Sequence, residues 1–382
     1  MDIAHFFTSV ALPLGSNLAG VASHVRLHRG EFPSLEGVAA AIFGVKSGVG
    51  SPGNEGCMEA PDVFREQFYR LAAIDSGFSI ADLGNIEAGA TPEDTLFAVK
   101  ESCSYLLKNK VLPIIIGGSQ ELTHAMYAAY EVMEHSVNLV TVDNKLDFGK
   151  SSVECNSSNY LNEIILHKPG FLFNYSNIAN QRSLVNPDML ELMEKMYFDL
   201  YRLGEVSGNI EDMEPVIRNA DIFSFDFAAI RASDAPGNMD ARPNGLFAQE
   251  ACTLCRYAGI SDKLSAAGFF EYNPALDPNG TGARLLAELV WYFLEGFYLR
   301  KGDYPACDTA EYTRYIVDLA SHNLVFYKSD KSDRWWMDVP FPSGTRNKLE
   351  RHHLVPCTYR DYQTATNDEL PDRWWRTYQK LV

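Results

Sequence analysis

Three apolar runs along the chain each break into polar residues of the kinds that bind metal ions or substrates. The segments are 111–121, 139–147 and 221–231. A short apolar run of this type is typical of a buried strand in a parallel sheet. In open α/β sheets, ligands bind at the carboxyl ends of the strands. We therefore expect the polar residues that end these three segments to lie close together and to form one site.

The remaining sequence predicts the elements that would position this site. Apolar runs at 38–44, 79–84 and 263–270 indicate further strands. Helical periodicity or capping signals indicate helices at 60–71, from 91, at 122–135, from 186, at 248–257 and at 282–298. The segment 155–182 has the composition of a loop. Strands that alternate with helices predict a mostly parallel central sheet between two helical layers, a three-layer α/β fold.

The polar strand ends resemble those of the arginase (ureohydrolase) family. That family's strand ends read Gly-Gly-Asp-His, Asp-Ala-His-x-Asp and Ser-x-Asp-x-Asp-x-x-Asp, and they hold two manganese ions. The segments 268–277 and 281–290 are also similar to the family's late strand and the helix after it. The resemblance covers roughly residues 36 to 300. It implies an arginase-like α/β domain over residues 1–305 and hydrolysis of a C–N bond.

Part of the family's ligand set is retained. Carried over position by position, the resemblance places three ligand carboxylates on Asp143, Asp147 and Asp226. It also places on Glu271 the glutamate that contacts the guanidinium-like group of the substrate in the family. In the absence of a metal, these four residues would be vestigial.

Other ligand positions are changed. The first histidine of the family falls on Gln120, a neutral amide, and the second falls on Lys145. At the third strand end, Ala228 and Arg231 stand where the family has aspartates. The losses at all three strand ends favour redirected selection over damage at one point.

Lys145 sets the expectation for the metal. An ammonium and a cation about 4 Å apart repel by ~4 kcal/mol per unit charge product at an effective dielectric constant of ~20. The same ammonium beside Asp143 and Asp226 would satisfy carboxylates that are otherwise buried without a partner, and Arg231 could help it. We therefore expect no bound cofactor, with Mn²⁺ present only if the protein is a working hydrolase.

Three hypotheses about function follow. The leading one is a pseudoenzyme of the arginase fold that acts as a binding or scaffolding protein. The alternative is a hydrolase of a guanidino or formimidoyl compound, similar to formimidoylglutamase, with Lys145 acting as a base or as an electrostatic group. The third is a sensor that binds a cationic ligand without turnover. In each case the expected ligand-binding residues are Gln120, Asp143, Lys145, Asp147, Asp226, Arg231 and Glu271. No catalytic residue is assigned beyond the vestigial Glu271 and Lys145.

The family's proton-shuttling histidine has no clear counterpart. His167 is the one histidine in the segment 148–182. A histidine in this context is more often packed or at a helix end than catalytic. We expect a structural role for it.

The last part of the chain lies outside the resemblance and forms a predicted extension, residues 306–382. It holds Trp335, Trp336, Trp374 and Trp375 in two Asp-Arg-Trp-Trp copies. Either the extension buries these indoles on the main domain, or they form a surface for a protein partner, since Trp and Arg are enriched at interface hot spots. Self-association is an expectation from the family.

Net charge and cysteine content restrict the expected partners and the expected cellular compartment. The net charge of −17, from 50 acidic and 33 basic residues, disfavours nucleic acid or an anionic membrane as the main partner. No apolar run reaches the ~20 residues that a membrane span requires, so no direct membrane insertion is expected. Seven scattered cysteines favour a reducing compartment. The expected location is the cytoplasm.

Overall fold

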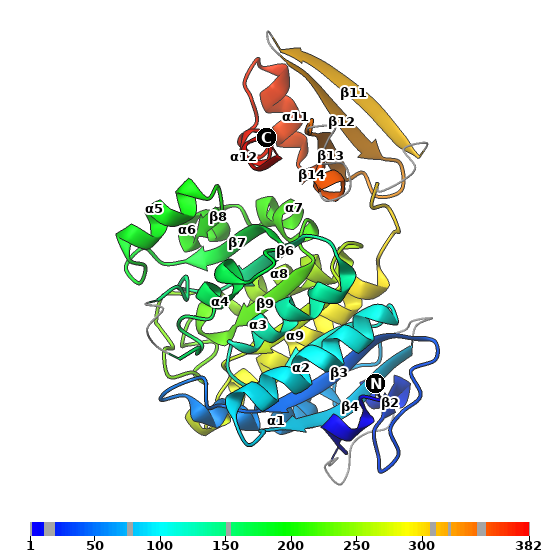
Figure 1. The fold of residues 1–382 in the computed structure, drawn as a ribbon, viewed down its shortest axis with the longest axis vertical. Coiled ribbons are helices and arrows are strands. Elements are labelled where there is room, and N and C mark those ends of the chain that lie inside the picture. The colour runs from blue at the N-terminus through cyan, green and yellow to red at the C-terminus, as the bar shows by residue number, and fades with distance from the viewer. Residues whose placement is uncertain are drawn as a thin grey trace.

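A central sheet of mostly parallel strands runs through the larger part of the molecule (Figure 1). The computed structural model describes residues 2–10, 20–74, 79–149, 154–305, 311–319, 322–341 and 349–381. Within these residues the sheet has ten strands in the order β1-β4-β3-β5-β10-β9-β6-β7-β8, with β2 also paired to β4. Only β1 is antiparallel to its neighbour among the described pairs. The strands are β1 (Phe7–Thr8), β2 (Val25–Leu27), β3 (Val38–Lys46), β4 (Ser79–Glu87), β5 (Leu112–Ile116), β6 (Val137–Val142), β7 (Leu172–Asn180), β8 (Asp199–Arg202), β9 (Ile222–Asp226) and β10 (Ala266–Phe270).

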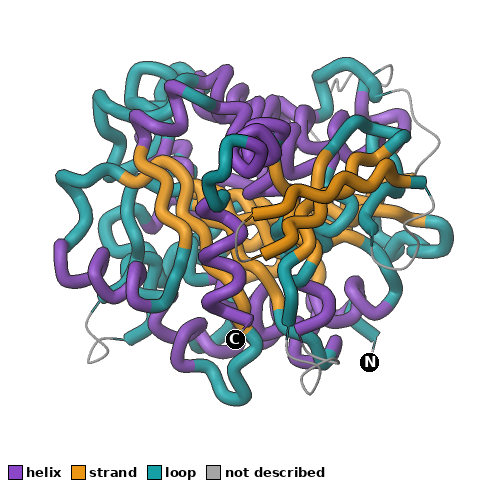
Figure 2. The backbone as a smooth tube through the Cα atoms, turned by 90° about the horizontal axis from the view of Figure 1, so that it is seen from above, coloured by secondary structure: helices purple, strands orange, loops and turns teal. Residues whose placement is uncertain are grey.

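Helices cover both faces of the sheet, and the strands run between the two helical layers (Figure 2). One face packs against α1 (Ala60–Phe68), α6 (Leu203–Gly208), α7 (Met213–Arg218), α8 (Ala248–Ile260) and α9 (Thr281–Tyr298). The other packs against α2 (Pro92–Lys108), α3 (Leu122–Ala128), α4 (Leu161–Leu166) and α5 (Pro187–Lys195). The fold is therefore the three-layer α/β architecture with a mostly parallel central sheet that the sequence predicts.

Local signals placed most of these elements correctly. Thr91 caps α2 by accepting from the backbone N–H of Asp94, and Asn186 caps α5 through the N–H of Asp188. The prediction of a loop over 155–182 is wrong, because this segment contains α4 and the nine-residue strand β7. The predicted helix at 122–135 is an α-helix only over Leu122–Ala128 and continues as a five-residue 3₁₀ segment (Ala129–Met133).

The C-terminal residues form a second, antiparallel sheet that stands at one end of the molecule, beside α7 (Figure 1). Its strands are β11 (Tyr312–Leu319), β12 (His322–Ser329), β13 (Trp335–Asp338) and β14 (Leu354–Cys357), followed by α11 (Tyr359–Thr366) and α12 (Asp372–Leu381). Strand β12 pairs with β13, β13 pairs with β14, and β14 contacts α7. The first few residues of the predicted extension, 306–310, lie outside the described residues.

The tryptophans of this C-terminal part are mostly interior residues. Trp335, Trp336 and Trp374 are buried, and they pack in or beside the core of the second sheet. Trp375 is 44% exposed. The predicted four-indole partner surface is therefore corrected to one exposed ring, because the other three supply the apolar area that this small sheet needs to fold.

Among the described helices, none combines the length and the apolar character that crossing a membrane requires.

Candidate metal centre

The candidate site lies where β5, β6, β9 and β10 reach the carboxyl edge of the sheet. Two glycines turn the chain directly after β5: Gly117 and Gly118 have φ angles of +76° and +78°. A Cβ atom on Gly118 would lie 2.9 Å from the carbonyl oxygen of Ser47. Side chains are therefore disfavoured at both positions. The turn delivers Gln120 to the ends of the neighbouring strands.

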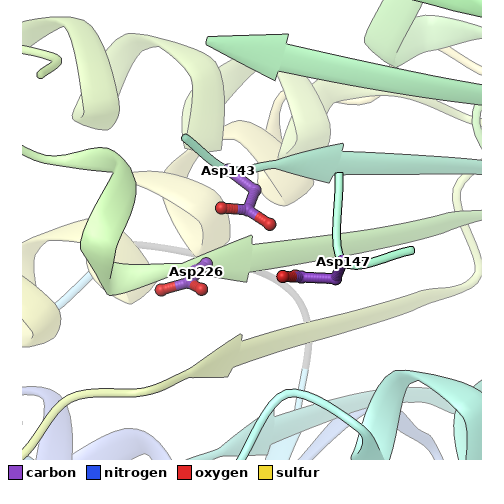
Figure 3. A group of neighbouring side chains, drawn as sticks. All are labelled: Asp143, Asp147 and Asp226. Atoms are coloured by element: carbon purple, nitrogen blue, oxygen red, sulfur yellow. The ribbon is translucent and has the colours of Figure 1, made fainter. Parts of the chain in front are cut away.

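Three buried carboxylates converge at this edge. Asp226 is the last residue of β9, Asp143 directly follows β6, and Asp147 lies four residues further on. One ligand oxygen from each lies within 4.8 Å of the others. The three side chains point toward a common space (Figure 3). The sequence prediction that these residues meet is confirmed by the geometry.

Local hydrogen bonds hold two of these carboxylates in place. Asp226 Oδ1 accepts from the backbone N–H of Ala228 at 2.6 Å, and Asp143 Oδ1 accepts from the N–H of Lys145 at 3.0 Å. Asn144 donates to the carbonyl oxygen of Ala228 at 2.7 Å and so joins the two strand ends. The carboxylates are thus oriented before any ligand arrives.

Close packing of like charges perturbs the acidity of the triad. Burial raises the pKa of Asp143, Asp147 and Asp226, and for Asp147 and Asp226 the nearby charge of Asp143 raises it further. Such a cluster of buried oxygens is stabilised by shared protons or by a cation. The local charge therefore favours a cation in the space between the three groups.

Gln120 completes the group of donors. Its side-chain amide lies against the triad, with the terminal atom 2.9 Å from Asp226 Oδ2 and 3.0 Å from Asp147 Oδ2. With its nitrogen toward the triad, the amide donates to both carboxylates. With its oxygen toward the triad, it becomes a fourth oxygen donor, which is favourable only with a cation between the oxygens. Without a cation the nitrogen-inward orientation is the favourable one, because in the other orientation the amide nitrogen faces only donors.

The two basic residues lie differently from the prediction. The Lys145 ammonium bonds to Asp240 and not to Asp143 or Asp226. Arg231 pairs with Asp234 at 2.8 Å and lies 3.8 Å over the ring of Phe247. The idea that these cations directly neutralise the triad is therefore wrong: both reach nearer partners on the loop and helix after β9.

The electrostatics of Lys145 also disfavour one suggested role. Burial lowers the pKa of Lys145, but the hydrogen bond to Asp240 and the charges of Asp147 and Asp226 raise it. Together they hold this pKa above its ordinary value. Lys145 therefore remains charged at neutral pH. It is unsuited to act as a general base.

Glu271 is held rigidly beside the triad. Its Oε2 accepts from Ser51 at 2.6 Å and from Asn54 at 2.8 Å, while Oε1 accepts from the backbone N–H of Gln120 at 2.9 Å. Its backbone has a φ of +67°, which is strained for a residue with a side chain. Asn54 and Asn238 stabilise this conformation by donating to the Glu271 carbonyl oxygen at 3.0 and 2.8 Å.

A cavity of about 250 Å³ opens onto these residues. Its wall includes Asp147, Asp226 and Glu271 together with Lys145, Ser51, Asn54, Asn144, Asn156, Ser157, Ser158, Asn238 and Asp240. The predicted site residues Asp143 and Gln120 lie just behind this wall, in contact with its carboxylates. Arg231 is not among the described lining residues.

Sequence reasoning missed several of these residues. Ser51 and Asn54 belong to the glycine-rich segment 46–56, which carries no motif of its own, and Asp240 lies 95 residues from its partner Lys145. No local pattern marks such residues, because their roles depend on contacts between distant loops.

His167 lies away from this cavity. Its Nε2 bonds to Glu131 Oε1 at 2.9 Å, and its ring packs edge-on against Tyr127 and Phe171. The structural role expected for this histidine is consistent with that packing.

The donor set fits one divalent cation better than two. Three carboxylate oxygens and an amide oxygen are ligands that Mn²⁺ and similar hard cations accept. A second ion beside the first would meet the methyl group of Ala228, which offers no ligand atom, and the charge of Lys145. The residues present therefore fit a single-ion centre at the triad.

Comparison with known proteins gives the context of this centre. The model of the Arginase family matches residues 38–295. The chain belongs to the arginase family. A curated relative is formimidoylglutamase of Staphylococcus aureus (strain MSSA476), 25% identical over 282 residues that cover 71% of this chain and 89% of the relative.

Solved structures share the fold. Formiminoglutamase of Trypanosoma cruzi with Mn²⁺ has a TM-score of 0.66 at 22% identity, covering 70% of this chain and 96% of that one. Formimidoylglutamase of Bacillus subtilis also has a TM-score of 0.66, at 16% identity, covering 76% and 95%. Agmatine ureohydrolase of Thermoplasma volcanium has a TM-score of 0.61 at 22% identity, covering 73% and 94%.

Proposed function

We propose that this member of the arginase family is a metal-dependent C–N hydrolase acting on a formimidoyl or guanidino compound. The observation that carries the proposal is the convergence of Asp143, Asp147 and Asp226 around a space that no described cation fills, since the Lys145 ammonium is engaged by Asp240. This reverses the balance set by the sequence alone, which favoured a pseudoenzyme. The formimidoylglutamase relatives support the same choice.

The proposed reaction is hydrolysis of an amidine. The oxygen of water adds to the amidine carbon, the bond from that carbon to the substrate amine breaks, and the amine leaves with a proton. The products are the free amine and formamide from a formimidoyl compound, or urea from a guanidino compound. A divalent cation, when bound, would supply hydroxide by lowering the pKa of its coordinated water.

The side chains around the cavity would bind and orient the substrate. A positively charged amidine group is attracted to the acidic wall formed by Asp147, Asp226 and Glu271. Among the described lining residues, Lys145 is the basic one, and its raised pKa keeps it charged. It is therefore suited to contact a carboxylate of the substrate, which favours a formimidoyl amino acid over an uncharged or purely cationic amine.

The first test is metal content, measured by elemental analysis of the full chain after incubation with Mn²⁺ and removal of free metal. We expect about one ion per chain in the wild type and loss of that ion in Asp147→Asn. Asp234→Asn is the matched control, because Asp234 pairs with Arg231 outside the triad. Retained metal in Asp147→Asn would contradict the assignment of the centre.

The second test is turnover, measured as formamide release from N-formimidoyl-L-glutamate and as urea release from arginine and agmatine. The proposal expects product that depends on added Mn²⁺ and is absent in Asp147→Asn. Bound metal without product from any of these compounds would point to the sensor hypothesis. A folded wild-type protein with neither metal nor product would restore the pseudoenzyme hypothesis.

A further inference from the structure

A second cavity, of about 390 Å³, lies at the opposite edge of the sheet from the Asp143–Asp147–Asp226 triad. Its wall includes Leu112 at the start of β5, Asp221 just before β9 and Ser265 just before β10. These are the amino ends of the strands whose carboxyl ends carry the candidate metal centre. The two cavities therefore lie at opposite ends of the same strands.

Basic side chains dominate the charge of this second cavity. Four cationic residues line it, namely Lys110, Lys263, Arg300 and Arg351, against the two carboxylates of Asp221 and Asp262. A local excess of positive charge is notable in a chain whose net charge is −17. An anion would be attracted to this cavity from solvent.

The two carboxylates are already engaged by groups of the protein. Asp221 accepts from Arg351 at 2.6 Å and from the backbone N–H of Asn138 at 2.8 Å. Asp262 accepts from the backbone N–H groups of Gly302 and Asp303 at 3.1 and 3.2 Å. Asp221 also lies 3.8 Å from the ammonium of Lys263, so the two carboxylates offset part of the positive charge and leave four cations against two anions.

The cations other than Arg351 have few charged partners. Arg300 donates to the carbonyl oxygens of Gly259 and Leu264, each at 2.9 Å. Lys110 is exposed and makes no ion pair with any described residue. Lys263 donates to the amide oxygen of Asn219 at 2.8 Å and lies 3.8 Å from Asp221. Burial lowers the pKa of Lys263 to about 8, although the charge of Asp221 opposes the shift, and the charge of Arg351 adds to it.

Much of the remaining wall is apolar, and Tyr130, His135 and Ser265 add polar groups to it. The apolar part is formed by Ala39, Leu107, Val111, Leu112, Met133, Leu264 and Phe297. The guanidinium of Arg300 lies 4.4 Å over the ring of Phe297. A cavity with an excess of cations and a largely apolar remainder matches a ligand with an anionic head and an apolar body.

We propose that this cavity is a binding site for a small organic acid, with its carboxylate held by Lys263 and Lys110 and its apolar body against Leu264 and Phe297. The site is independent of the proposed hydrolase function, because it shares no residue with the metal centre. Arg351, which belongs to the C-terminal part of the chain, also lines the cavity, so residues from both parts of the molecule form its wall.

The experiment is isothermal titration of the full-length protein with phenylacetate, using phenylacetamide as a probe of the same shape without the charge. We expect one phenylacetate per chain with a Kd on the order of 1 mM or below, and roughly tenfold weaker binding of phenylacetamide. Lys263→Met should weaken phenylacetate binding about tenfold and Lys110→Gln about threefold. Lys195→Gln, an exposed lysine on α5, is the matched control and should bind as the wild type does.

Equal affinity for phenylacetate and phenylacetamide would overturn the proposal, as would the absence of binding at about 10 mM. Lys110→Gln keeps the test decisive if Lys263→Met fails to fold, because Lys110 is a surface residue. Unchanged binding in Lys110→Gln together with unchanged binding in a folded Lys263→Met would also overturn it. None of these outcomes depends on bound metal or on hydrolysis, so failure here leaves the proposed function standing.

Discussion

Glu121 is a buried carboxyl group next to Gln120 that has no cation as its partner. It is 5% exposed, its Oε1 accepts from Ser119 at 2.5 Å, and its Oε2 has no hydrogen-bond partner among the described residues. Burial raises the pKa of Glu121 to about 7, and the charge of Glu271 adds to the shift although the bond from Ser119 opposes it. The group is thus protonated in the folded chain under conditions where the unfolded chain has released the proton.

The sign of the resulting pH dependence follows from linkage. Between the ordinary pKa of 4.5 and about 7 the folded state binds one more proton than the unfolded state, so the free energy of unfolding falls as pH rises. Glu121→Gln removes this contribution while keeping an acceptor for Ser119. We expect the free energy of unfolding of the variant, taken relative to that of the wild type, to be about 1–3 kcal/mol higher at pH 8 than at pH 5. Urea unfolding of both proteins at pH 5 and pH 8 measures these free energies. The same difference between variant and wild type at both pH values would contradict the prediction.

At the residue scale, the sequence predicted which side chains come together, but it did not predict which of them form hydrogen bonds and ion pairs with one another. The aspartates follow apolar strands, so their convergence required only the sheet to be parallel. The partner of Lys145 could not be predicted in this way, because Asp240 lies on a loop whose path depends on Asn238, Asn54 and Glu271. Pairing between loops is decided by tertiary contacts that leave no periodic signal.

At the scale of elements, β7 shows why one strand escaped prediction. Its sequence is rich in asparagine and serine, yet its second half is buried. The amide nitrogens of its asparagines are bonded nearby: Asn174 donates to Asp199, Asn177 to the carbonyl oxygen of Lys145, and Asn180 to that of Tyr201. Because hydrogen bonds replace apolar contact here, the hydrophobic pattern that marks the other parallel strands is absent.

Helices α8 and α9 depend on close backbone contact at two glycines. A Cβ atom on Gly259 would lie 2.0 Å from the carbonyl oxygen of Phe293, and one on Gly296 would lie 2.4 Å from that of Arg256. Gly259→Ala should therefore force the helices apart and reduce the free energy of unfolding by about 1–3 kcal/mol. Thermal or urea unfolding measures the loss.

The matched control is Gly204→Ala in α6, where a Cβ atom meets nothing within 4 Å. There the gain in helix propensity should leave stability unchanged or raise it by up to about 1 kcal/mol. If Gly259→Ala is as stable as Gly204→Ala, close packing at this pair of helices is not limiting.

At the scale of the whole molecule, Arg218 joins the three-layer domain to the second sheet. Its side chain is 4% exposed, pairs with Glu214 at 2.9 Å, and donates to the carbonyl oxygens of Trp335 and Cys357, each at 3.2 Å. Its guanidinium lies 4.4 Å over the ring of Trp336. One buried cation on α7 thus donates to backbone carbonyl groups of both β13 and β14. The junction therefore includes buried hydrogen bonds as well as apolar contacts.

Arg218→Met should therefore weaken the docking of the second sheet. The change leaves two buried carbonyl groups without their donor and leaves the partly buried Glu214 with only its more distant partner Arg334, at 3.6 Å, a loss on the order of 3 kcal/mol. Differential scanning calorimetry should show an early transition for the C-terminal part, separated from that of the three-layer domain. Arg360→Met is the control, because Arg360 pairs with Asp212 across the same junction at 2.8 Å but is 67% exposed, and an exposed pair contributes about 0–1 kcal/mol. A single transition in Arg218→Met, at the temperature seen for Arg360→Met, would mean that the apolar contacts of α7 with β14 hold the two parts together without the buried arginine.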